Sequence, residues 1–138
     1  MTLLSKPYGK ADLARKVAAS LVDQRQVVLV VEDEGLVRAA AVDMVADLGF
    51  VVFEAADATE ALAILDRDGR IDILFTDIGL PDMRGDDLAR QARAKRPDLR
   101  IILASGYTDR GAVEGLAGVT GLNKPYDASA LARALRED

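Results

Sequence analysis

The chain has 138 residues, half of them hydrophobic, and carries a net charge of −5. This length fits a single domain, the acidic charge argues against direct nucleic-acid binding, and no apolar run reaches the roughly 20 residues of a membrane span. The sequence contains neither cysteine nor histidine, which excludes thiol chemistry, imidazole catalysis and metal sites built from those residues. Because its start has no signal-peptide pattern, we expect the protein to be cytoplasmic.

Strand and helix patterns alternate from residue 27 onward. The continuous apolar run Val27–Val31 predicts a strand that is buried on both faces. Apolar residues at helical spacing predict a helix over residues 36–48, and residues 50–54 predict a short strand. Asp57, with Glu60 three residues later, predicts the capped start of a second helix.

The same alternation continues through the middle of the chain. Residues 71–76 predict a third strand, followed by a loop rich in glycine, proline and aspartate over residues 77–85. A helix is predicted over residues 86–95, because the proline at position 97 disfavours helical backbone just before it. Residues 101–104 predict a fourth strand.

The region after the fourth strand has a weaker pattern. Five glycines between residues 106 and 121 predict at best a short helix over residues 111–116 or an ordinary loop. A short last strand is expected around Leu122, and Asp127 predicts the cap of a final helix. The whole pattern predicts an α/β fold, a doubly wound, five-stranded parallel sheet with helices on both faces.

Five polar residues stand where the predicted strands end: Glu32, Asp33, Asp77, Ser105 and Lys124. In a doubly wound sheet the carboxyl ends of the strands form the ligand-binding crevice, so we expect these side chains to converge. Three carboxylates at such short range repel one another unless they bind protons or a cation, and oxygen ligands alone favour Mg²⁺. Asp77 is then a plausible nucleophile that forms an acyl phosphate, while Lys124 and Ser105 hold phosphoryl oxygens.

Four segments together resemble the receiver domain of bacterial response regulators. They are residues 27–34 (VVLVVEDE), 74–81 (LFTDIGLP), 102–107 (ILASGY) and 124–126 (KPY). The resemblance extends from Val27 to the end of the chain and agrees in order and spacing. It implies the flavodoxin-like receiver fold and a role in a two-component phosphorelay.

The resemblance assigns roles to the acidic residues. Asp77 is expected to take a phosphoryl group from the phosphohistidine of a histidine kinase or histidine phosphotransfer protein. Mg²⁺ is expected to bind Asp33, Asp77 and the backbone carbonyl of Gly79. Glu32 stands where an aspartate is more usual, and it is expected to reach the ion through water. The domain is expected to catalyse its own phosphotransfer and dephosphorylation, and we expect no separate enzyme activity in it.

The resemblance also assigns a switch, with one departure. Ser105 is expected to be the hydroxyl that moves toward the phosphoryl group, and Lys124 the ion-pair partner, with a cis peptide bond to Pro125. Gly121 stands where many receivers have an aromatic residue whose rotation reports phosphorylation. Tyr107 is a possible substitute for that aromatic residue.

The start of the chain repeats part of its end. When the sequence is shifted by 118 positions, eight of the nineteen residues from Thr2 to Ser20 are identical, including Lys-Pro-Tyr at 6–8 and 124–126. We therefore expect residues 1–24 to be the remnant of a preceding receiver plus a linker, and residues 25–138 to be the receiver domain. The parent is then a hybrid histidine kinase or a tandem-receiver protein. The alternative is a native amphipathic extension.

Two other functions remain open on the sequence. Gly121 and the weak helix pattern over residues 111–116 favour a receiver-like interaction module without phosphorylation, whereas the presence of all five site residues argues against it. A Mg²⁺ titration distinguishes the two. A magnesium-dependent phosphatase is disfavoured, because Ile78 and Gly79 offer no second carboxylate after Asp77. A homodimer is possible.

Overall fold

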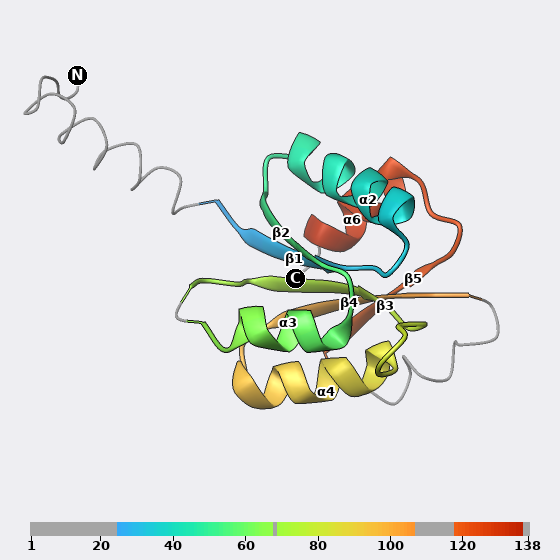
Figure 1. Cartoon of the computed structure of the whole chain (residues 1–138). Coiled ribbons are helices and arrows are strands. Elements are labelled where there is room, and N and C mark those ends of the chain that lie inside the picture. The colour runs from blue at the N-terminus through green and yellow to red at the C-terminus, as the bar shows by residue number, and fades with distance from the viewer. Residues whose placement is uncertain (1–24, 68, 107–117, 137–138) are drawn as a thin grey trace, which may run out of the picture.

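A five-stranded parallel sheet forms the centre of the computed structural model, which describes residues 25–67, 69–106 and 118–136. Its strands lie in the order β2-β1-β3-β4-β5 (Figure 1). The strands are β1 (Val27–Val31), β2 (Val51–Ala55), β3 (Ile73–Asp77), β4 (Arg100–Ser105) and β5 (Val119–Asn123). This order confirms the predicted doubly wound sheet. The strand order reverses between β1 and β3, because β2 is added on one side of β1 and the later strands on the other.

Helices cover both faces of the sheet. They are α2 (Gly35–Asp47), α3 (Ala58–Leu65), α4 (Gly85–Lys95) and α6 (Ala128–Arg136). Figure 1 shows α2 and α6 on one face and α3 and α4 on the other. Alternate residues of β1 supply two separate cores: Leu29 packs with α3 and α4, while Val28 and Val30 pack with α2 and α6. This division explains why β1 is buried along its whole length.

The predicted helix caps are confirmed. The Asp57 carboxylate accepts a hydrogen bond from Glu60 N at 2.8 Å, and the Glu60 carboxylate accepts one from Ala56 N at 2.6 Å. The Asp127 carboxylate accepts from Ala130 N at 2.8 Å at the start of α6. The Asp57 and Asp127 carboxylates each satisfy a first-turn amide that the helix itself leaves unpaired, and Glu60 binds the backbone just before the cap.

Most predicted element boundaries differ from the observed ones by one or two residues. β3 begins at Ile73 and not at residue 71; Asp72, just before it, donates from its backbone amide to Val27 O at 2.9 Å and accepts from Val27 N through its carboxylate at 2.8 Å. Helix α4 begins at Gly85, one residue earlier than predicted. The predicted helix over residues 111–116, Tyr107 and residues 1–24 lie outside the described residues.

Two arginines bind helix C-termini near the amino ends of the strands. The Arg96 guanidinium donates to Leu65 O at the end of α3, at 2.8 Å from Nη2 and 3.1 Å from Nε. The Arg100 guanidinium donates to Ala134 O at 3.1 Å and to Leu135 O at 3.0 Å in α6. Cations at these positions satisfy free carbonyls and oppose the negative end of the helix dipole. No helix in the described part of the chain is both long and apolar enough to cross a membrane.

Candidate functional site

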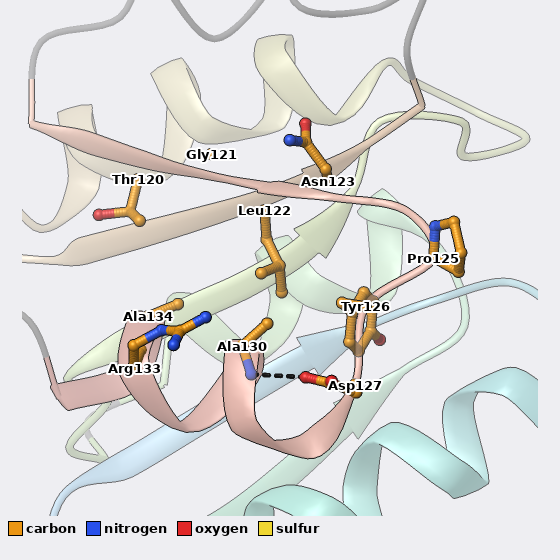
Figure 2. Close-up of a pocket in the computed structure, with 10 residues that line it drawn as sticks. All are labelled: Thr120, Gly121, Leu122, Asn123, Pro125, Tyr126, Asp127, Ala130, Arg133 and Ala134. Carbon is orange, nitrogen blue, oxygen red and sulfur yellow. Dashed lines mark hydrogen bonds between the residues drawn. The ribbon is translucent and has the colours of Figure 1, made fainter.

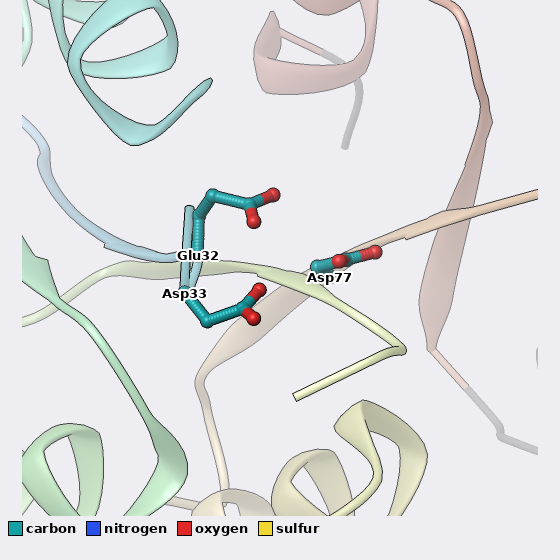
Figure 3. A group of neighbouring side chains, drawn as sticks. All are labelled: Glu32, Asp33 and Asp77. Atoms are coloured by element: carbon teal, nitrogen blue, oxygen red, sulfur yellow. The ribbon is translucent and has the colours of Figure 1, made fainter. Parts of the chain in front are cut away.

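The acidic residues predicted to converge lie together at the carboxyl ends of β1 and β3. Glu32 and Asp33 directly follow β1, and Asp77 is the last residue of β3. One carboxylate oxygen from each of the three lies within 4.8 Å of the other two (Figure 3). Glu32 is buried, Asp77 is partly buried and Asp33 is exposed, so the cluster opens to solvent on one side. The arrangement offers hard oxygen ligands at a spacing that suits one divalent cation.

Glu32 shows the electrostatic consequence of this crowding. Burial is the largest cause that raises the pKa of its carboxyl group, and the hydrogen bond with Asp33 and the negative charge of Asp77 raise it further. The backbone amide of Glu34, which donates to the Glu32 carboxylate at 3.1 Å, and the Lys124 ammonium act in the opposite direction. The cluster therefore has excess negative charge that a cation would neutralise.

Lys124 supplies the positive charge at the site. Its Nζ lies 2.6 Å from Asp77 Oδ1, and the Asp77 side chain is only 13% exposed. The backbone amide of Lys124 donates to Ser105 O at 2.9 Å, and the Lys124–Pro125 peptide bond is cis, as predicted. Ser105 is buried at the end of β4, one residue beyond Ala104, which pairs with Asp77 across the sheet. All the predicted side chains thus stand at one edge of the sheet.

The loop after Asp77 is closed by backbone contacts. Ile78 N donates to Ala104 O at 3.2 Å, and Gly85 N donates back to Ile78 O at 2.8 Å. Gly79 forms an isolated antiparallel bridge with Arg84. A Cβ built on Gly79 would lie 3.9 Å from Asp77 Oδ2, so the residue predicted to supply a backbone ligand is close to the acid cluster.

Gly85 is required where α4 begins against the end of β3. A Cβ at this position would overlap the carbonyl oxygen of Asp77 and lie 2.8 Å from both the Asp77 carbonyl carbon and Ile78 Cα. These are backbone atoms, which cannot rotate away as a flexible side chain can. The first turn of α4 therefore supports the backbone of Asp77 directly.

Sequence reasoning missed two residues beside the acids. The Tyr126 ring packs edge-to-face on Phe75, with ring centres 5.7 Å apart, and its pKa is raised by burial and by the charges of Glu32 and Asp77. Arg38 in α2 donates from Nη1 to the carbonyl oxygen of Glu32 at 2.8 Å. Tyr126 follows Lys124-Pro125 in the sequence and was a visible candidate, whereas nothing in the helical pattern marked Arg38.

A separate groove of about 420 Å³ lies between β5 and α6 (Figure 2). Its lining includes Gly121, Asn123, Tyr126 and Arg133. Its lining includes one carboxylate, Asp127, which is engaged in capping α6, so the groove has no acid cluster like that in Figure 3. Gly121 is exposed in β5, which leaves this edge of the sheet without the aromatic side chain that the resemblance led us to look for.

Comparisons with known proteins agree with this geometry. The family model for the response regulator receiver domain matches residues 28–136. The chain is 37% identical over 114 residues to the sensor kinase CckA of Brucella abortus, covering 80% of this chain and 12% of the kinase. It is 36% identical over 110 residues to the chemotaxis protein CheY of Pseudomonas aeruginosa, covering 75% of this chain and 88% of that protein.

Solved structures show the same fold. A response regulator receiver protein from Pseudomonas putida matches with a TM-score of 0.74 and 32% identity, covering 83% of this chain and 98% of that one. The receiver domain of the hybrid histidine kinase CckA matches with a TM-score of 0.69 and 33% identity, covering 80% of this chain and 95% of that one. This chain therefore belongs to the response regulator receiver family, the phosphoryl-accepting domains of two-component signalling systems.

Proposed function

We propose that Asp77 accepts a phosphoryl group from the phosphohistidine of a histidine kinase or histidine phosphotransfer protein, in a reaction that requires Mg²⁺. The observation that carries this proposal is the meeting of Glu32, Asp33 and Asp77, with ligand oxygens within 4.8 Å, beside the Lys124 ammonium 2.6 Å from Asp77. An acid cluster of this kind is costly to keep unless it binds a cation.

The proposed metal ligands are the Asp33 and Asp77 carboxylates and the Gly79 carbonyl, with Glu32 reaching the ion through water. When bound, Mg²⁺ neutralises negative charge on the phosphoryl oxygens. One carboxylate oxygen of Asp77 is the nucleophile that attacks phosphorus, and the other would hold the cation; the Lys124 ammonium lies 2.6 Å from Oδ1. The new bond joins this oxygen to phosphorus as the phosphorus–nitrogen bond breaks, and the imidazole of the donor leaves with that electron pair.

Ser105 and Lys124 are the proposed contacts for the remaining phosphoryl oxygens. Ser105 ends β4, and its backbone carbonyl already accepts from Lys124 N at 2.9 Å, so the two residues are held together. A hydroxyl donor and an ammonium at this position stabilise the charge of the product acyl phosphate. Since Gly121 has no side chain to rotate, the outward signal of this switch must travel by another route.

We also propose that residues 1–24 are the remnant of a preceding receiver, in a cytoplasmic hybrid histidine kinase or tandem-receiver protein. The repeat of Lys-Pro-Tyr at 6–8 and 124–126 supports this, as does the relation to a kinase of which this chain spans 12%. Homodimer formation stays a prediction that sedimentation would test.

Phosphorylation of the purified chain tests the central proposal. With a small-molecule phosphodonor and Mg²⁺, intact-mass spectrometry should show one added phosphoryl group, which EDTA prevents. Asp77→Asn should lose it, whereas Asp87→Asn should keep it, because Asp87 is an exposed acid in α4 that pairs with Arg90. Phosphorylation that survives in Asp77→Asn contradicts the assignment. If the wild-type chain neither binds Mg²⁺ nor reacts, the interaction-module alternative replaces it.

A further inference from the structure

Asp82, in the loop between β3 and α4, is bonded to the first turn of α3. Its Oδ1 accepts from Ala58 N at 3.0 Å, and its Oδ2 accepts from Thr59 N at 2.9 Å and from the Thr59 hydroxyl at 2.6 Å. The hydroxyl bond is the largest cause that lowers the Asp82 pKa to about 2, and the two amide bonds add to it. One carboxylate thus satisfies three donors on an element that precedes it by more than twenty residues.

The same loop carries the proposed backbone ligand. Gly79 and Asp82 are three residues apart, and the loop is pinned at its base by the Gly79–Arg84 bridge and by Gly85 N donating to Ile78 O at 2.8 Å. Leu80 and Met83 pack against the core below the loop, and the bonds that Asp82 accepts fix its tip to α3. The direction of the Gly79 carbonyl therefore depends on both attachments.

We propose that Asp82 is a positioning residue for the metal site, which holds the Gly79 carbonyl toward Asp77 by clamping the loop to the first turn of α3. This inference rests on the proposed function, because it takes the Gly79 carbonyl as a Mg²⁺ ligand. Asp82 itself contributes no ligand: its oxygens are engaged by Ala58 and Thr59.

Helix α3 provides a matched control for this clamp. Asp57 caps the same helix, accepting from Glu60 N at 2.8 Å, but it belongs to the segment that leads into α3. Asp57→Ala and Asp82→Ala each remove one negative charge and one N-terminal cap from α3, and only Asp82→Ala frees the loop. Asp82→Asn keeps one side-chain oxygen, but its NH₂ group cannot accept a hydrogen bond, so this variant loses part of the clamp together with the charge.

The experiment is a calorimetric Mg²⁺ titration of the full chain and of these three variants. Changes to the partners of metal ligands commonly weaken metal affinity by about 10- to 100-fold, so we expect Asp82→Ala to weaken it by roughly tenfold. Asp57→Ala should stay within about threefold of wild type, since loss of one charge outside the ligand shell is a smaller effect, and Asp82→Asn should fall between Asp57→Ala and Asp82→Ala.

Amide hydrogen exchange gives a second readout that helix stability alone does not move. Because coupling between two sites is reciprocal, Mg²⁺ should slow exchange of the Ala58 and Thr59 amides in wild type, and Asp82→Ala should abolish that slowing. Both results together support the clamp.

Other outcomes overturn it. If Asp57→Ala weakens Mg²⁺ binding as much as Asp82→Ala, the effect belongs to helix stability or to charge and the clamp is wrong. Unchanged affinity in Asp82→Ala refutes the clamp while leaving the proposed function intact. A wild-type chain that does not bind Mg²⁺ removes the proposed function and the clamp together.

Discussion

A single methyl group at Gly85 tests how tightly α4 supports the reactive aspartate. In Gly85→Ala the new Cβ overlaps the Asp77 carbonyl oxygen and lies 2.8 Å from Ile78 Cα, so the end of β3 or the start of α4 must shift. Overpacking of this kind costs about 1–3 kcal/mol, and we expect the upper part of that range because only backbone is in contact. Alanine recovers up to about 1 kcal/mol in helix propensity, which leaves a net loss of roughly 1–2 kcal/mol.

Gly35→Ala is the matched control, because Gly35 is the first residue of α2 as Gly85 is of α4. A Cβ there has no atom within 4 Å, so alanine should stabilise the fold by about 0.4–1 kcal/mol. The assay is urea unfolding followed by circular dichroism. With a slope of about 2 kcal/mol per molar, Gly85→Ala should lower the midpoint by roughly 0.5–1 M and Gly35→Ala should raise it. Equal midpoints for the two variants would refute the close approach of α4 to Asp77.

Two further predictions concern stability. The raised pKa of Glu32 means that the folded state binds its proton more tightly than the unfolded state, so the folded state is penalised as pH rises above the ordinary value of 4.5. Without Mg²⁺, Glu32→Gln should therefore unfold at higher urea than wild type at pH 7.5, and the difference should shrink at pH 4; an equal gain at both pH values contradicts this. Arg100→Met removes two bonds to α6 carbonyls and should cost about 1–2 kcal/mol, whereas Arg90→Met removes one exposed ion pair and should stay within about 0.5 kcal/mol. Urea midpoints compare the two arginine variants, and similar losses would show that the Arg100 contacts add little.

The fold could be predicted from the sequence because the apolar patterns of single strands and helices agree with the alternating order of these elements along the chain. The unbroken apolar run of β1 predicted burial on both faces, and the caps at Asp57 and Asp127 marked two helix starts that the structure confirms. The convergence of the acids followed from topology alone, because parallel strands end at one edge of the sheet.

The contacts that hold the site were not predictable in the same way. Asp82 caps a helix 23 residues earlier in the chain, and Arg100 reaches carbonyls 34 and 35 residues later. Such partners depend on how whole helices and strands pack against one another, and the spacing of apolar residues in the sequence does not predict that packing. Gly35 and Gly85 are both first residues of helices, yet only the structure shows that Gly85 faces backbone and Gly35 faces open space.

These contacts share one feature: each segment that carries a proposed ligand is held by the beginning of a different helix. Arg38, in the first turns of α2, bonds the carbonyl of Glu32. Gly85 at the start of α4 supports Asp77, and the first turn of α3 holds Asp82 and hence the loop of Gly79. Parallel connections bring helix N-termini to the carboxyl edge of the sheet, so this arrangement follows from the topology.

Helix C-termini lie at the opposite edge, where Arg100 anchors α6. Substitutions at the two edges should therefore differ in their effects on stability and on Mg²⁺ affinity. Arg100→Met should lower the unfolding midpoint while leaving Mg²⁺ affinity unchanged, because it touches no ligand-bearing segment. Arg38→Met should weaken Mg²⁺ binding beyond what its loss of stability explains, because it releases the carbonyl of Glu32. If both variants changed affinity in proportion to their stability, the site would depend on the fold as a whole and not on these three helix starts.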